Sequence, residues 1–101
     1  MNMQLEVERK KIDEIDERIA ALVSERLNLA KRIGSLKRRA GPLQGAGREG
    51  GDGVLVPGRE QGILDRLAAK HPSLPREALE GIFREIFAAA RAAQAPPGVE
   101  P

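Results

Sequence analysis

The 101-residue chain contains no cysteine, tryptophan or tyrosine, and its only aromatic side chains are Phe83 and Phe87. Without cysteine there is no disulfide framework, thiol nucleophile or cysteine-based metal site. With so few aromatics, the core must be aliphatic and modest. The sequence also lacks strand-like alternation and any apolar run of secretory or membrane-spanning length. We therefore expect a single all-α domain in the cytoplasm, with no membrane association.

The sequence has little net charge and a single histidine. The 17 lysine and arginine residues nearly match 15 aspartate and glutamate residues, which leaves a net charge of +2. This balance argues against a dedicated nucleic-acid binder. Basic residues do cluster locally, at Lys31, Arg32, Lys37, Arg38, Arg39 and Arg48, but no aromatic side chain lies near them to stack on bases. His71 is the only histidine and lies in a Lys-His-Pro-Ser turn. Such a position is typical of a solvated loop residue, so we predict no metal site.

Apolar spacing predicts three helices of long, short and medium length. The first runs from about Leu5 to Arg39, with acidic residues early and basic residues late. The second runs from about Pro57 to Lys70, and the third from about Pro75 to Gln94 after a helix entry at Ser73. Core positions are predicted on the last two helices at Ile63, Leu64, Leu67, Leu79, Ile82, Phe83, Ile86, Phe87 and Ala90.

Two segments lack the apolar side chains needed for packing. Residues 41–53 hold six glycines and one proline, which predicts a flexible loop. The segment 95–101, APPGVEP, cannot continue a helix and is predicted to be a disordered tail. The domain thus spans residues 1–94, and with no second domain in the sequence we expect a free-standing protein.

The first helix carries an aliphatic stripe that one arginine interrupts. Arg26 occupies a stripe position, and Lys37 lies 11 residues later, so the two differ by only about 20° around a helix. No acidic residue shares their stripe, which indicates a site for a small anion of several negative charges. The stripe itself repeats in steps of three and four, as in a coiled-coil seam, and we expect it to pair with its copy in a second subunit. Its aliphatic members are Ile12, Ile15, Ile19, Leu22, Leu29, Ile33 and Leu36.

Three stretches carry a family resemblance: RKKIDEIDERIAALVSERLNLAKRIGSLK (9–37), REQGILDRL (59–67) and IFREIFAAARAAQ (82–94). Together they resemble the all-helical class of chorismate mutases, the type II family. The resemblance implies an intertwined antiparallel homodimer with two identical sites. It also implies rearrangement of chorismate to prephenate, in phenylalanine and tyrosine biosynthesis, without a cofactor.

The resemblance further implies roles for individual residues. Arg26, Lys37 and Gln94 would be catalytic, with Lys37 and Gln94 donating to the ether oxygen. Arg9 of the second chain and Arg26 would grip the substrate carboxylates. Arg59 would help order the site, and Glu60 would accept a hydrogen bond from the ring hydroxyl.

Two positions depart from the family pattern. Val56 stands where an acidic residue is often found, and Ala90 where a small hydroxylated residue is often found. Asp52 is a possible substitute for the first. Two alternatives stay open: elimination of pyruvate from isochorismate by the same fold, and a non-catalytic helical dimerisation or regulatory module. An acidic side chain paired with Arg26 favours the module, and a cationic cavity favours an enzyme.

Overall fold

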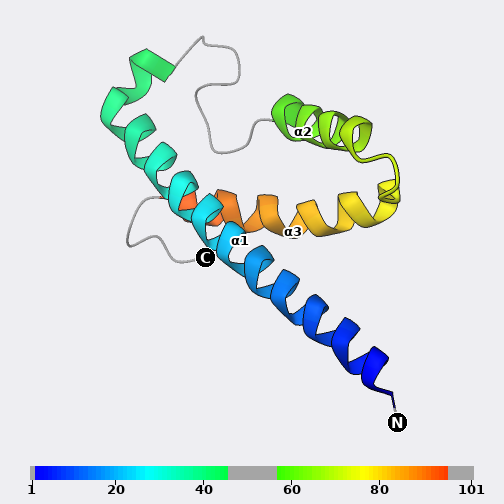
Figure 1. The fold of residues 1–101 in the computed structure, drawn as a ribbon. Coiled ribbons are helices and arrows are strands. Elements are labelled where there is room, and N and C mark those ends of the chain that lie inside the picture. The colour runs from blue at the N-terminus through cyan, green and yellow to red at the C-terminus, as the bar shows by residue number, and fades with distance from the viewer. Residues whose placement is uncertain (1, 46–56, 96–101) are drawn as a thin grey trace.

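A computed structural model describes residues 2–45 and 57–95, which form three helices and, within these ranges, no strand. The helices are α1 (Met3–Gly45), α2 (Pro57–Lys70) and α3 (Arg76–Gln94) (Figure 1). The predicted all-α class and the order long, short, medium are confirmed. The predicted positions Asp52 and Val56, most of the predicted loop and all but the first residue of the predicted tail lie outside the described residues.

Both ends of α1 differ from the prediction. The helix begins at Met3, where the Asn2 side-chain oxygen Oδ1 accepts a hydrogen bond from the Leu5 amide at 3.2 Å. This is an N-cap contact that satisfies an amide of the first turn. At its other end α1 continues to Gly45, so the predicted end at Arg39 is wrong. Extending an existing helix costs less than starting a new one, and α1 continues through Gly41 and Pro42 although both have poor helix propensity.

The short helix matches its prediction, and the third nearly does. α2 spans Pro57–Lys70 as predicted. Proline suits the first position of a helix, because an N–H group there would have no acceptor within the helix. α3 begins at Arg76, and its N-cap is Pro75, which makes no side-chain capping bond. Ser73 is therefore not the cap. The turn before α3 is instead closed by a hydrogen bond from the Leu74 amide to the His71 carbonyl at 3.0 Å.

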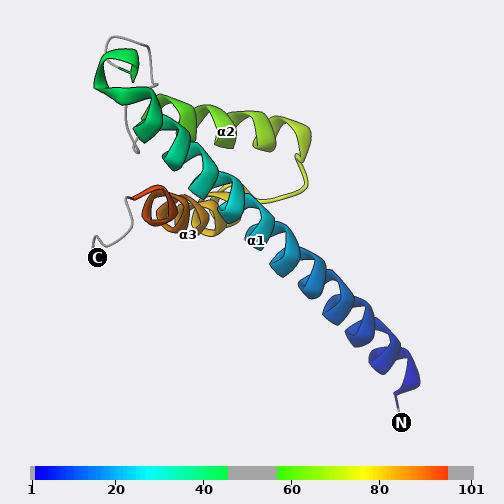
Figure 2. The ribbon, with the colours of Figure 1, turned by 90° about the vertical axis from the view of Figure 1, so that its left-hand side faces the viewer.

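Helix α3 contacts both of the other helices and crosses α1 (Figures 1 and 2). The molecule extends 64 Å along its longest axis, about the length of a 43-residue helix at 1.5 Å per residue. The N-terminal half of α1 projects beyond the crossing with no other helix beside it. None of the helices in the described ranges has the length and apolarity needed to span a bilayer.

The buried apolar core of one chain is small. Among the described residues its members are Ala30, Ile63, Leu79, Phe87 and Ala90. The Phe83 and Phe87 rings pack at a centroid distance of 5.6 Å with a tilt of 55°, a favourable geometry for an aromatic pair. Ile82 is 54% exposed in this chain, so its prediction as a core residue is wrong here. The apolar stripe of α3 is wider than the surface that α1 and α2 cover.

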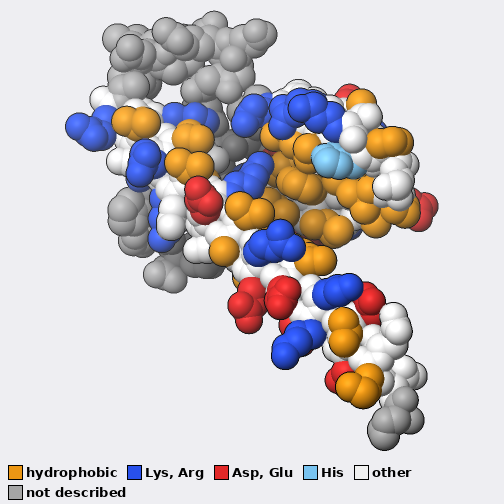
Figure 3. Space-filling view, in the orientation of Figure 1, with side chains coloured by type: hydrophobic (Ala, Val, Ile, Leu, Met, Phe, Trp, Pro, Cys, Tyr) orange, Lys and Arg blue, Asp and Glu red, His pale blue; other side chains and the backbone are white. Residues whose placement is uncertain are grey.

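The aliphatic stripe of α1 is exposed along its length. Ile12, Ile19 and Leu22, all in the first half of α1, are 57%, 53% and 62% exposed. Hydrophobic side chains are visible on this projecting segment in Figure 3. A row of exposed aliphatic side chains along one helix is typical of a site of protein association.

Candidate active site

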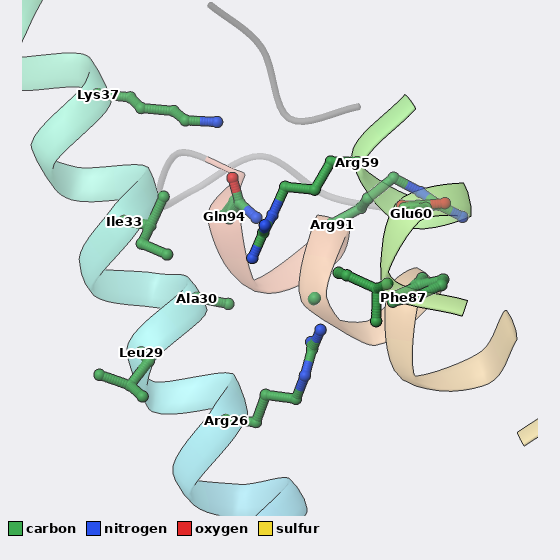
Figure 4. Close-up of a pocket in the computed structure, with 12 residues that line it drawn as sticks. Arg26, Leu29, Ala30, Ile33, Lys37, Arg59, Glu60, Phe87, Arg91 and Gln94 are labelled. Carbon is green, nitrogen blue, oxygen red and sulfur yellow. The ribbon is translucent and has the colours of Figure 1, made fainter. Parts of the chain in front are cut away.

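A cavity of about 420 Å³ opens where α1, α2 and α3 meet (Figure 4). Its volume is that of a small-molecule site. Helix α3 lies between the other two and supplies the base of the cavity, and α1 and α2 line its sides. The lining combines aliphatic and aromatic surface with charged groups from all three helices: Arg26, Leu29, Ala30, Ile33, Lys37, Arg59, Glu60, Ile63, Phe87, Ala90, Arg91 and Gln94.

Five of the six residues assigned to the site from the sequence lie in this one cavity. Arg26 and Lys37 come from α1, Arg59 and Glu60 from the first turns of α2, and Gln94 from the last turn of α3. Figure 4 shows Lys37 extending from α1 into the cavity and Arg59 reaching toward Gln94. Residues far apart in the sequence thus share one space because α3 bridges α1 and α2.

The lining charges favour an anionic ligand. Arg26, Lys37, Arg59 and Arg91 are cationic, and Glu60 is the one carboxylate among the lining residues. The lining therefore has a net charge of +3. A cavity of one sign with apolar walls concentrates ligands of the opposite sign.

Arg26 lies in the cavity against an aromatic ring, with no carboxylate partner in the described part of the chain. Its guanidinium carbon lies 5.6 Å from the centroid of the Phe87 ring, a cation–π contact. Among the described residues none forms an ion pair with Arg26. Partial burial lowers the pKa of Arg26, and the positive charge of Arg59 lowers it further, whereas Glu60 opposes the shift. Within one chain this is the cationic cavity that favours an enzyme over a dimerisation module.

Arg91 is a lining residue that the sequence analysis missed. Its Nη1 lies 2.6 Å from Oε2 of Glu60, and both side chains are about two-thirds buried. The pair joins α3 to the start of α2 across the cavity rim. A signal was present in the sequence: Arg91 follows Phe87 by four residues and precedes Gln94 by three, so all three share one face of α3.

Gln94 ends α3 with its side chain in the cavity. Its side-chain oxygen Oε1 is buried and accepts no hydrogen bond from the described residues. Its main-chain carbonyl accepts a hydrogen bond from Arg38 Nη1 at 2.7 Å. A buried amide oxygen without a donor is rare in proteins, and here it belongs to a residue that faces a cationic cavity.

Arg9 is the one predicted site residue that lies outside the cavity of its own chain. It sits on the projecting half of α1, is exposed, and forms an ion pair with Glu6 at 3.6 Å. Ala90, where the family pattern often has a hydroxyl group, is buried and lines the cavity. No group of three or more potential metal ligands occurs among the described residues.

Two comparisons show what the chain is similar to. Residues 8–95 match the family described as chorismate mutase type II. A curated relative is the bifunctional chorismate mutase/prephenate dehydratase of Aquifex aeolicus (strain VF5), which is 39% identical over 87 residues. That match covers 80% of this chain and 21% of the relative, so the chain spans about a fifth of the relative's length. No solved structure matches the chain.

Proposed function

Because this chain belongs to the chorismate mutase type II family, we propose that it converts chorismate to prephenate in the cavity between its three helices. The observation that carries the proposal is the meeting of Arg26, Lys37 and Gln94 in one cationic cavity. The reaction is an intramolecular Claisen rearrangement, in which a carbon–oxygen bond breaks as a carbon–carbon bond forms. It requires no nucleophile, metal or redox cofactor.

Two tasks remain for the protein, and the cavity has groups suited to both. The first is to hold a dicarboxylate in its compact reactive conformer, for which Arg26 is suited because a guanidinium grips a carboxylate through two parallel hydrogen bonds. The second is to stabilise negative charge on the ether oxygen as its bond breaks. We assign this to the ammonium group of Lys37 and the side-chain amide of Gln94.

Glu60 and Arg59 serve the rest of the substrate in this proposal. Glu60 Oε2 is bound by Arg91, and the other carboxylate oxygen is left to accept a hydrogen bond from the ring hydroxyl. Arg59 lies close enough to Arg26 for its charge to shift the Arg26 pKa. This repulsion is relieved when a dianion enters between the two guanidinium groups.

The test is to follow chorismate by ultraviolet absorbance and to identify the product. Formation of prephenate supports the proposal. Release of pyruvate from isochorismate, with chorismate unchanged, would assign the lyase activity instead. With neither reaction, the chain would be a non-catalytic dimerisation or regulatory module. Cytoplasmic location and the lack of nucleic-acid binding stay predictions.

The exposed stripe of α1 supports a homodimer with shared sites. In an antiparallel pair of α1 helices whose two-fold axis passes near Ile19, the partner subunit's Arg9 lies level with the segment between Arg26 and Ile33. A residue from the exposed end of one helix thereby completes the cavity of the other chain. The dimer would also cover the aliphatic surface that one chain leaves exposed.

We predict that the protein sediments as a dimer at micromolar concentration. Ile19→Glu places a charge in the stripe and should shift the protein toward monomer, with loss of helical signal. Ser24 is exposed on the opposite face of α1, so Ser24→Glu is the matched control and should remain dimeric. A folded wild-type monomer at this concentration would contradict the intertwined arrangement.

Arg91→Met is expected to lower kcat/KM for chorismate about tenfold. The substitution leaves the Glu60 carboxylate without its 2.6 Å partner, and the cavity loses one positive charge. A hydrogen bond to a charged group is worth about 1.5–3 kcal/mol, enough for an effect of this size. Arg84→Met is the control, because Arg84 is exposed on α3 outside the cavity. Equal kcat/KM values for the Arg91 and Arg84 variants would show that Arg91 has no role in the site.

A further inference from the structure

Helix α1 packs closely against the end of α3 at Gly34. A Cβ atom built on Gly34 would lie 2.6 Å from the carbonyl oxygen of Gln94 and 2.7 Å from its Cα. Real Cβ atoms essentially never come so close to other atoms, and the atoms met here are backbone, which cannot rotate away. Only glycine at position 34 permits the observed distance between the two helices.

Arg38 fixes the same residue from one turn further along α1. Its Nη1 donates to the Gln94 carbonyl oxygen at 2.7 Å. Carbonyl groups in the last turn of a helix have no partner within the helix, and they carry its negative dipole end. The Arg38 guanidinium donates a hydrogen bond to the carbonyl and places a positive charge at the negative end of the helix dipole. Because Gly34 and Arg38 are four residues apart, they lie on one face of α1.

The two contacts act on the backbone of a residue whose side chain lies in the cavity. The Gln94 side chain starts at a Cα atom that can lie this close to α1 because residue 34 is glycine. The carbonyl group of the same residue is bound by Arg38. Catalytic groups tolerate little displacement, and a shift of about 1 Å can cost a hundredfold in rate. The distance between α1 and α3 therefore determines where this amide is placed.

We propose that Gly34 and Arg38 are positioning residues that set the Gln94 side-chain amide in the cavity. The inference rests on the proposed function for its effect on rate. It goes beyond that function by assigning roles to two residues that do not contact the substrate. Gly34 supplies the space for close approach, and Arg38 holds the end of α3 in that space.

The test compares glycine-to-alanine variants within helices. Gly34→Ala is expected to lower kcat at least tenfold with little change in KM, since Gln94 is displaced while Arg26 is not. Gly62→Ala and Gly81→Ala are matched controls, because a Cβ at either position meets nothing within 4 Å. Both should keep wild-type activity. Wild-type kcat in Gly34→Ala would overturn the proposal.

A double variant separates positioning from a general loss of fold. In a Gln94→Ala background, Gly34→Ala should produce no further loss of kcat, because the group it displaces is already gone. Two losses that multiply would show that Gly34 acts on something other than Gln94. That outcome would overturn the inference and leave the proposed function standing.

Arg38 supplies a variant without steric conflict, which decides the matter if Gly34→Ala does not fold. Arg38→Gln should lower kcat severalfold, and Arg38→Lys should recover part of it; unchanged kcat in Arg38→Gln would overturn the proposal. A readout independent of catalysis is the side-chain amide NMR signal of Gln94. It should shift in Gly34→Ala and Arg38→Gln but not in Gly81→Ala. An unshifted signal overturns the positioning role even if the protein does not convert chorismate.

Discussion

Replacing Arg26 by methionine is expected to lower kcat/KM for chorismate by about three orders of magnitude, or about 4 kcal/mol. The variant loses two hydrogen bonds from a guanidinium to a substrate carboxylate, each worth about 1.5–3 kcal/mol when one partner is charged. Methionine keeps the unbranched apolar stem of the side chain and removes the guanidinium, including its cation–π contact with the Phe87 ring. The effect should therefore come from lost charge and donors and not from a new cavity.

The free energy of unfolding of Arg26→Met should not fall with its activity. This difference distinguishes an arginine that binds a ligand from one that stabilises the fold. Burial and the charge of Arg59 both disfavour the charged form of Arg26 in the free protein. Arg26→Met removes these costs, so its free energy of unfolding should equal or slightly exceed that of the wild type. If Glu14 or Glu25 of a partner chain paired with Arg26, breaking a buried pair would instead cost about 3–5 kcal/mol.

The matched control for this substitution is Arg66→Met. Arg66 is exposed on α2 and does not line the cavity. Activity is measured by chorismate consumption, and stability by urea unfolding followed by circular dichroism. The control should match the wild type in both. Equal activity in the Arg26 and Arg66 variants would contradict the assigned site.

Arg9→Ala is expected to lower kcat/KM by two to three orders of magnitude, roughly the value of a charge-assisted grip on a carboxylate. Among the described residues of its own chain, Arg9 makes only an exposed ion pair with Glu6 at 3.6 Å, and such pairs contribute little to stability. The folded dimer should therefore persist. A large loss of activity from so exposed a residue requires a role in the site of the partner subunit.

Lys11→Ala controls for the loss of an exposed cation from the same helix. Lys11 pairs with Glu8 at 3.4 Å, in the same i,i+3 geometry as Arg9 with Glu6. We expect its kcat/KM to stay within about twofold of wild type, since a surface ion pair of this kind is worth at most about 1 kcal/mol. Equal losses in the two variants would point to a general effect of charge at this end of α1.

Periodicity and helix punctuation explain what was predicted from the sequence. The bounds of α2 were predictable because Pro57 begins a helix and the His71-Pro72 turn ends one. Arg26 and Lys37 were assigned to one face because an 11-residue spacing nearly completes whole helical turns. Arg59, Glu60 and Gln94 came from the family resemblance, since spacing alone does not reveal which helices meet at a cavity.

The features that were missed depend on tertiary distance. Gly34 looks like a residue of poor helix propensity until α3 is seen packed against it, so close that a Cβ atom at this position would lie 2.6 Å from the Gln94 carbonyl oxygen. The role of Arg91 depends on Glu60, which is 31 residues away and on another helix. Ile82 has the spacing of a core residue, but it is left 54% exposed by the three described helices. Each error arises because the local sequence pattern shows which face of a helix a residue lies on, but not which other helix packs against that face.

Mixing the Arg9→Ala and Arg26→Ala proteins, under conditions that exchange subunits, tests the central claim most directly. Each mixed dimer should carry one site with both defects and one with neither. Random exchange gives about half mixed dimers, so activity should return to about a quarter of the wild-type value. If subunit exchange is verified and activity does not recover, the result contradicts a site shared between two chains.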